Sequence, residues 1–326
     1  MAFVPTITSV QPLRAVEGGR VTIGGSSFPL DDLSTLCLGD RSARVSFASS
    51  SRIVIVIPEG VEGRLPLKVP GVPLQTTYID VGGRWATGLH QVDSPVFDRD
   101  GNLFVTYSGS RGQEAPVSLF RVTPDGTREP FASGIVNPTS LAIGPDGRLY
   151  VSSRFEGAVY RVREDGSAEQ AAGDLGVACG IAFDGDGSMY VGDRSGTVFR
   201  VRDGRATPFA TLPASVAAFH LAMSPAQELF VTAPTLSAFD HVYRIDRTGE
   251  CRPLPHPLGR PQGLAFGPDG ALYVVDAVAG ASGVYRFADP EGRPELVISG
   301  PSLVGIAFGP GGAMAVTSNE TAYRFN

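Results

Sequence analysis

Residues 262–274 read QGLAFGPDGALYV, the clearest copy of a pattern that predicts the fold of most of the chain. An apolar segment, 264–266, leads into Pro268-Asp269-Gly270, and a second apolar segment, 272–274, follows the turn. Proline presets φ at such a turn, and glycine accepts the positive φ that the turn requires. The stretch therefore predicts two antiparallel strands joined by a tight turn.

The same pattern recurs along the chain. A third strand is expected after each copy, as at residues 159–162 (VYRV), where an aromatic residue and an arginine fall on opposite faces. A second turn then leads to an outer fourth strand. Four short strands per unit with a period of roughly 40 residues predict a β-propeller blade, and six copies predict six blades. When the six copies are aligned on the first turn, the position of the turn glycine is occupied by Gly101, Gly147, Gly187, Gln227, Gly270 and Gly312.

The two ends of the repeat region predict how the ring closes. The last unit ends at residues 322–326, its third strand, with no chain left for a fourth. Residues 84–88, before the first unit, take the place where a fourth strand is needed. We expect this strand to complete the last blade, which also hides both strand edges.

The first 82 residues lack the repeat and form a separate predicted domain, 1–82, before the propeller at 83–326. Short apolar strands are expected at 20–23, 52–57 and 65–69, separated by turns rich in glycine and proline. This spacing is typical of a small β-sandwich. The predicted fold class is thus all-β throughout.

Residues 7–12 (ITSVQP) and 18–28 (GGRVTIGGSSF) carry a family resemblance. Together with residues 38–40 (LGD) and 57–60 (IPEG), they resemble the IPT/TIG family of immunoglobulin-like domains over roughly residues 5–82. The resemblance implies an immunoglobulin-like sandwich that acts as a spacer or an interaction domain. It implies no chemistry for this part of the chain.

Composition excludes some classes of partner. A formal net charge of −6, with no run of Arg or Lys, argues against binding a nucleic-acid backbone. No apolar stretch reaches the ~20 residues needed to span a bilayer, so no membrane association is predicted. The N-terminus shows no signal-peptide pattern. A soluble protein is expected, with the compartment left open between the cytoplasm and a trimmed secreted protein.

The three cysteines, Cys37, Cys179 and Cys251, are widely separated. An odd number without C-x-x-C spacing argues against a disulfide framework or a zinc site. Burial as small apolar side chains is the expected role.

One face of the propeller is the better candidate for a site. Its loops are the longer and more variable ones, for example 107–116 and 233–241, whereas the turns of the other face are short. Binding residues usually lie on such loops over a rigid scaffold. Where the innermost strands begin at this face, they place a ring of candidate ligand-binding residues around the axis: Asp93, Thr139, Cys179, Phe219 and Gln262.

Further candidates lie beside this ring. His220 follows Phe219 in the fourth unit, diametrically opposite Asp93, and both are expected to line a central funnel. His220 is the candidate catalytic residue, while a packed structural histidine is the alternative. Loops would bring further ligand-binding residues to the mouth, namely Arg154, Arg194 and His241.

Residues 93–97 (DSPVF) carry a second resemblance, covering roughly residues 84–326. They resemble the motif that opens the propeller of the senescence-marker-protein/gluconolactonase (regucalcin-like) family; NHL-repeat proteins have related propellers. The family's members are metal-dependent lactonases, so the resemblance implies that Asp93 is a metal ligand. The positions of the other two family ligands hold Phe219, which cannot ligate a metal, and Gln262, a weak donor for a hard cation.

Two hypotheses of function follow. In the first, the propeller is a binding module that recognises a small molecule, a glycan or a protein in its central funnel. In the second, it is a metal-dependent hydrolase of the gluconolactonase type, acting on a lactone or ester. A divalent cation (Ca²⁺, Zn²⁺ or Mg²⁺) would then be held by Asp93 with Gln262, Asp193 or Asp276, and His220 would act as general base.

Overall fold

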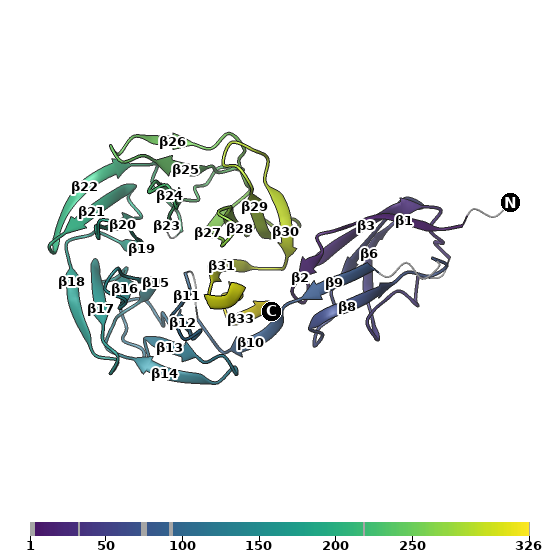
Figure 1. Ribbon diagram of the computed structural model, residues 1–326, viewed down its shortest axis with the longest axis horizontal. Helices are drawn as coiled ribbons and strands as arrows, with labels where there is room; N and C mark the ends of the chain where they lie inside the picture. The colour runs from purple at the N-terminus through teal and green to yellow at the C-terminus, as the bar shows by residue number, and fades with distance from the viewer. Residues whose placement is uncertain (1–3, 32, 73–76, 91–93, 218, 326) are drawn as a thin grey trace.

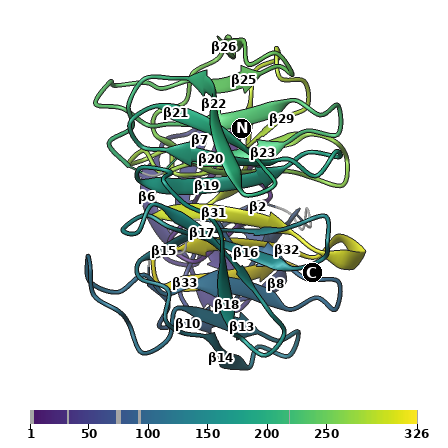
Figure 2. The same cartoon turned by 90° about the vertical axis from the view of Figure 1, so that its left-hand side faces the viewer.

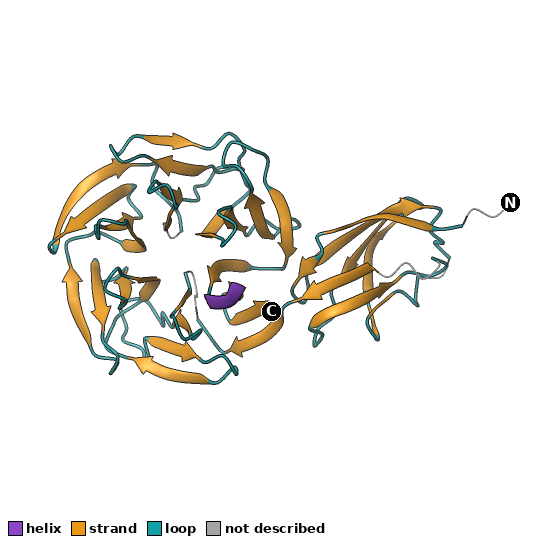
Figure 3. Ribbon diagram, in the orientation of Figure 1, coloured by secondary structure: helices purple, strands orange, loops and turns teal. Residues whose placement is uncertain are grey.

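The computed structural model describes residues 4–31, 33–72, 77–90, 94–217 and 219–325. Strands make up nearly all of its regular structure, and within these ranges the only helix is a short 3-10 turn, η1 (Pro310–Gly312) (Figure 3). The predicted all-β class is confirmed. Among the described residues, no helix has both the length and the apolar character that crossing a bilayer requires.

The N-terminal part is built from two sheets that share one core. Alternation along β3 (Arg20–Ser26) and β7 (Arg52–Val56) buries Val21, Ile23, Ile53 and Ile55 on one face, against Leu38 of the second sheet. The first sheet has the order β1 (Thr6–Gln11), β3 (Arg20–Ser26), β7 (Arg52–Val56), β6 (Arg44–Ala48). The second contains β2 (Arg14–Ala15), β9 (Thr77–Val81), β8 (Gly63–Lys68), β4 (Cys37–Leu38) and β5 (Arg41–Ser42).

After residue 82 the strands pair antiparallel in groups of four, arranged around a common centre (Figure 1). Seen from the rim (Figure 2), outer strands such as β18 and β22 lie nearest the viewer. The groups in chain order are β11 (Val96–Phe97), β12 (Leu103–Thr106), β13 (Leu119–Val122), β14 (Arg128–Ala132); β15 (Pro138–Ile143), β16 (Leu149–Ser153), β17 (Ala158–Val162), β18 (Ala168–Ala172); and β19 (Ala178–Phe183), β20 (Met189–Asp193), β21 (Thr197–Arg202), β22 (Arg205–Thr211).

The second half of the ring continues the pattern. Its groups are β23 (His220–Met223), β24 (Leu229–Thr232), β25 (Val242–Ile245), β26 (Cys251–Pro253); β27 (Pro261–Phe266), β28 (Leu272–Asp276), β29 (Gly283–Phe287), β30 (Glu295–Ser299); and β31 (Leu303–Phe308), β32 (Met314–Ser318), β33 (Thr321–Phe325), β10 (Gly83–Thr87). In the last group β10 pairs antiparallel with β33, placing Arg84 opposite Tyr323. Strands from the two ends of the region thus share one sheet.

Turn chemistry and aromatic contacts explain why the groups repeat. Gly270 has φ +75° in its turn, and Gln227 holds the equivalent position with φ +61° despite its side chain. The turn shape is therefore kept even where glycine is replaced. Neighbouring groups meet through edge-to-face rings such as Tyr150–Phe183 and Tyr273–Phe308, each with centroids 4.9 Å apart.

The two parts of the chain are joined by continuous hydrogen bonding. Strand β2 runs parallel to both β9 and β30, so one sheet extends from the N-terminal part into the ring. Beside it, Glu17 Oε1 accepts hydrogen bonds from Arg84 Nε (2.5 Å) and Tyr323 Oη (3.0 Å). Burial, reinforced by the Glu17 carboxylate, raises the pKa of Tyr323 to about 12. The junction is a packed interface and not a free linker.

Candidate functional site

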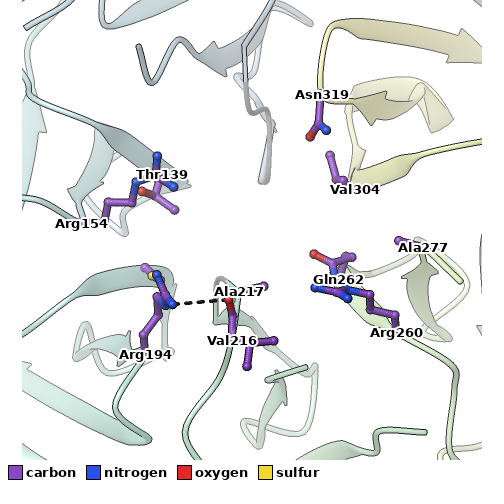
Figure 4. Close-up of a pocket in the computed structure, with 11 residues that line it drawn as sticks. Thr139, Arg154, Arg194, Val216, Ala217, Arg260, Gln262, Ala277, Val304 and Asn319 are labelled. Carbon is purple, nitrogen blue, oxygen red and sulfur yellow. Dashed lines mark hydrogen bonds between the residues drawn. The ribbon is translucent and has the colours of Figure 1, made fainter. Parts of the chain in front are cut away.

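A cavity of about 370 Å³ opens among the inner strands of the ring (Figure 4). Its wall combines cationic, neutral polar and small apolar side chains, and no Asp or Glu of the described residues lines it. A pocket of this size holds a small molecule. The lining residues are Thr139, Arg154, Cys179, Arg194, Val216, Ala217, Arg260, Gln262, Ala277, Val304 and Asn319.

Two repeated positions of the four-stranded groups supply most of this wall. The first is the start of the innermost strand, which contributes residues such as Thr139 in β15 and Gln262 in β27. The second directly follows the next strand, where Arg154 comes after β16 and Arg194 after β20. Equivalent ends of neighbouring sheets point to the same axis, so residues far apart in sequence meet there.

Several of the predicted ligand-binding residues meet at this cavity, and others do not. The residues that line it are Thr139, Cys179, Gln262, Arg154 and Arg194. Phe219 is instead fully buried in the apolar cluster around Leu221 and Val231. His241 is not among the lining residues, and its Nδ1 lies 2.7 Å from the carbonyl oxygen of Leu254. Asp93, predicted as a ligand-binding residue and metal ligand, falls outside the described residues.

His220 lies in the interior of the ring and does not line the cavity. Its side chain is 1% exposed, and its Nδ1 lies 3.2 Å from Oγ of Ser94, which comes from the opposite side of the ring. Its Nε2 is buried without a hydrogen-bond partner among the described residues. Burial lowers the pKa of His220 to about 4, so the ring is neutral at pH 7 and a weak base. This environment suits a packed histidine better than a general base.

The aspartates that were alternative metal ligands hold loops in place. Asp276 accepts hydrogen bonds from the backbone amides of Gly259 (2.8 Å), Arg260 (2.7 Å) and Val278 (3.0 Å). Asp193 accepts from the amides of Val177 (2.8 Å) and Ser195 (3.2 Å). Both oxygens of each carboxylate have hydrogen-bond partners, Oδ2 of Asp193 through the Ser195 hydroxyl. Their role is to fix the loops that carry Arg260 and Arg194.

The described residues do not fit a divalent-metal site. Nowhere among them do three His, Cys, Asp or Glu side chains gather as potential ligands. Hard cations need several oxygen ligands, usually carboxylates. The gluconolactonase resemblance implies metal ligands at positions 219 and 262. Phe219 is buried in the core, and Gln262 offers only a neutral amide to the cavity. We therefore derive no catalytic step through a metal.

The N-terminal part can be assigned by comparison with known families. A family model matches this two-sheet sandwich. Residues 5–80 match the IPT/TIG domain. The resemblance inferred from the sequence is thereby confirmed for this part of the chain. All residues that line the cavity lie outside the IPT/TIG domain.

Solved structures resemble the chain in fold at low sequence identity. A gluconolactonase from Xanthomonas campestris has a TM-score of 0.63 at 15% identity, covering 90% of this chain and 98% of that one. An auxiliary nutrient binding protein from Bacteroides thetaiotaomicron gives 0.58 at 11%, covering 99% and 97%. Virginiamycin B lyase from Staphylococcus aureus gives 0.51 at 14%, covering 73% and 95%. No curated protein matches the sequence.

Sequence reasoning missed several residues of the cavity wall. Arg260 lies two positions before Gln262, just outside the predicted ring, and Asn319 follows β32 as Arg154 follows β16. Extending the repeat alignment by these positions would have found both. A second cavity of about 400 Å³ shares Arg154 and Arg194 with the first. Its wall also contains Arg111, Asn137, Phe155, Gly176 and Val177.

Proposed function

We propose that residues 83–326 form a six-bladed β-propeller that binds a small molecule in its central cavity. In this proposal β10 closes the ring as the fourth strand of the last blade, and residues 1–82 form the IPT/TIG domain. The pairing of β10 with β33 and the arrangement of the sheets around one centre support it. The fold shared with solved propeller proteins supports it as well.

One observation carries the assignment of a binding function. The cavity wall is built from hydrogen-bonding groups of different sheets, whereas the nearby carboxylates are already engaged by backbone amides. Among the described residues, donors are thus directed at a ligand, whereas Asp193 and Asp276 are held by backbone amides and are not directed at the cavity. The volume favours a small molecule or a terminal sugar over a folded protein. The likeness to nutrient binding proteins agrees with such a role.

The IPT/TIG domain would act as a fixed support for the propeller. Strand β2 ties it to β30 by sheet hydrogen bonds, and Glu17 ties it to both β10 and β33. A spacer held in this way keeps the cavity at a constant orientation relative to anything that the domain contacts.

A metal-dependent lactonase is the second candidate. Its support is the fold shared with gluconolactonases and the sequence at residues 94–97, which follows the family motif after Asp93. Such an enzyme would need a cation to polarise the lactone carbonyl. The carboxylates of Asp193 and Asp276 are unsuited to hold it, because they stabilise backbone amides.

The test fills the cavity without removing a polar group. Ala277→Phe places a ring in the wall, and Ala279→Phe, on an exposed position of the same loop, is the matched control. Binding of neutral and acidic monosaccharides and disaccharides is measured by calorimetry. δ-Gluconolactone hydrolysis is measured with added Ca²⁺, Zn²⁺ or Mg²⁺.

We expect at least one of these sugars to bind wild type and Ala279→Phe with similar affinity. Ala277→Phe should lose that binding because the ring occupies the ligand volume. Metal-stimulated hydrolysis that disappears only in Ala277→Phe would show that the cavity is an active site and overturn the non-catalytic proposal. Binding that survives in Ala277→Phe would show that the ligand site lies elsewhere.

A further inference from the structure

Three guanidinium groups converge on the cavity from different sheets. Figure 4 shows Arg154 and Arg194 on one side of it and Arg260 on the other. The remaining polar groups of the wall are neutral, and no described Asp or Glu is part of it. The concentration of positive charge stands out in a chain whose formal net charge is −6.

Neutral groups accept hydrogen bonds from two of these side chains. Arg194 Nη2 donates to the carbonyl oxygen of Val216 (3.4 Å), and Arg154 Nη2 donates to the buried hydroxyl of Ser108 (3.1 Å). Among the described residues, neither Arg194 nor Arg260 takes part in an ion pair. The closest acids along the chain, Asp193 and Asp276, are turned to backbone amides.

The positive charge of the wall favours a negatively charged ligand. Like charges in a concave site walled by protein repel one another more strongly than they would in open water. A bound anion removes that repulsion and supplies acceptors for the guanidinium N–H groups. Arginine suits this role because its planar fork pairs with both oxygens of a carboxylate or phosphate.

The rest of the wall indicates what carries the anionic group. Thr139, Gln262 and Asn319 offer neutral donors and acceptors of the kind that pair with hydroxyl groups. The second cavity shares Arg154 and Arg194 with the first and adds the ring of Phe155, which is 55% exposed. An exposed aromatic ring provides a flat apolar surface for the face of a sugar ring.

We infer that the cavity binds an acidic sugar, a hydroxyl-rich small molecule whose carboxylate or phosphate group is held by Arg154, Arg194 and Arg260. This inference rests on the proposed binding function and names its ligand class. A uronic acid and a sugar phosphate both offer an anionic group on a sugar. The experiment below distinguishes between these two kinds of ligand.

The experiment compares three probes on the full chain by calorimetry: D-glucuronate, D-glucose 6-phosphate and the neutral D-glucose. We expect one of the two anions to bind at least about tenfold more tightly than glucose, a difference of ~1.4 kcal/mol. Preference for glucuronate indicates a carboxylate ligand, and preference for glucose 6-phosphate a phosphate ligand. Binding should weaken as NaCl rises, since the attraction is between charges.

Variants locate the effect. Arg194→Gln and Arg260→Gln should each weaken binding of the preferred anion at least about tenfold, and by more than they weaken binding of glucose. Arg194→Lys should recover part of the loss, because it restores the charge without the fork. Arg247→Gln, on an exposed turn away from the cavity, is the matched control. Thermal melting of each variant separates loss of binding from loss of folding.

Each failure is informative. If glucose binds the cavity as tightly as both anions, the anion inference is overturned while the proposed binding function stands. If the Gln variants bind the anion like wild type, the arginines are not its site. If neither anion binds at about 10 mM, the acidic-sugar inference is wrong. Metal-dependent lactone hydrolysis in the cavity would instead overturn the non-catalytic binding proposal itself.

Discussion

The arginines on the third strands of the blades and those at the cavity have the same chemistry but different neighbours. Arg161, Arg244 and Arg286 each lie beside an acid on an adjacent strand or turn, with Arg244 Nη2 2.6 Å from Glu228 and Arg286 Nη2 2.8 Å from Asp269. Arg194 and Arg260 have no such partner among the described residues, and they face a cavity.

The contrast indicates how a regular repeat accommodates the proposed ligand site. Where a strand arginine is matched by a carboxylate, its charge is neutralised and the pair belongs to the scaffold. Asp193 and Asp276 lie close in sequence to the cavity arginines, but they do not line the cavity and accept hydrogen bonds from backbone amides. Their anchoring of the loops leaves guanidinium groups facing the opening. Asp193 and Asp276 thus position Arg194 and Arg260 through the loops and form no ion pair with them.

Removing an anchoring carboxylate should have the largest effect. Asp276→Ala leaves the amides of Gly259, Arg260 and Val278 without their acceptor, in a site where Asp276 is 2% exposed. We expect a loss of about 3 to 4 kcal/mol in the free energy of unfolding, measured by urea denaturation. Asp276→Asn, which keeps one acceptor oxygen, should lose less. Equal stability of wild type and Asp276→Ala would contradict an anchoring role.

Acidification should act through the buried interior. The folded-state pKa of His220 is about 4, below the unfolded value of about 6.5, so its contribution to stability is complete above pH 6.5 and is lost as pH falls toward 4. The loss amounts to about 3 kcal/mol. When the pH is lowered from 7 to 4, the free energy of unfolding should therefore fall by about 3 kcal/mol less in His220→Gln than in wild type. An unchanged pH profile in His220→Gln, with His256→Gln as control, would argue against a neutral buried ring.

Breaking a scaffold ion pair should have the smallest effect. Arg286 and Asp269 have side chains 30% and 38% exposed, so water and salt screen their attraction. Arg286→Gln should cost less than about 1 kcal/mol and leave the binding of acidic sugars unchanged. If this variant weakened anion binding as much as Arg260→Gln, the distinction between scaffold and cavity arginines would not hold. Calorimetry of both variants under identical conditions checks this.

Much of the architecture could be predicted because it depends on local rules. The turn at Pro268-Asp269-Gly270 and the alternation along residues 272–276 each act within a few residues, so their repetition is visible in the chain. Placement of Thr139 and Gln262 at the axis followed from the same repeat. Phe219, at the equivalent position, turned into the core instead. Its large apolar ring is more stable among Leu221 and Val231 than in an open cavity.

Strand alternation and turn chemistry are local, so the all-β class, the blade-like repeat and the IPT/TIG resemblance could be inferred from the sequence alone. Three relations required the folded structure. Arg260 lies across the cavity from Arg154 and Arg194, Asp193 and Asp276 accept hydrogen bonds from backbone amides, and β2 joins the two parts in one sheet. Those relations depend on loop paths and on contacts between distant blades. Such contacts form when the ring assembles, and no short-range pattern records them.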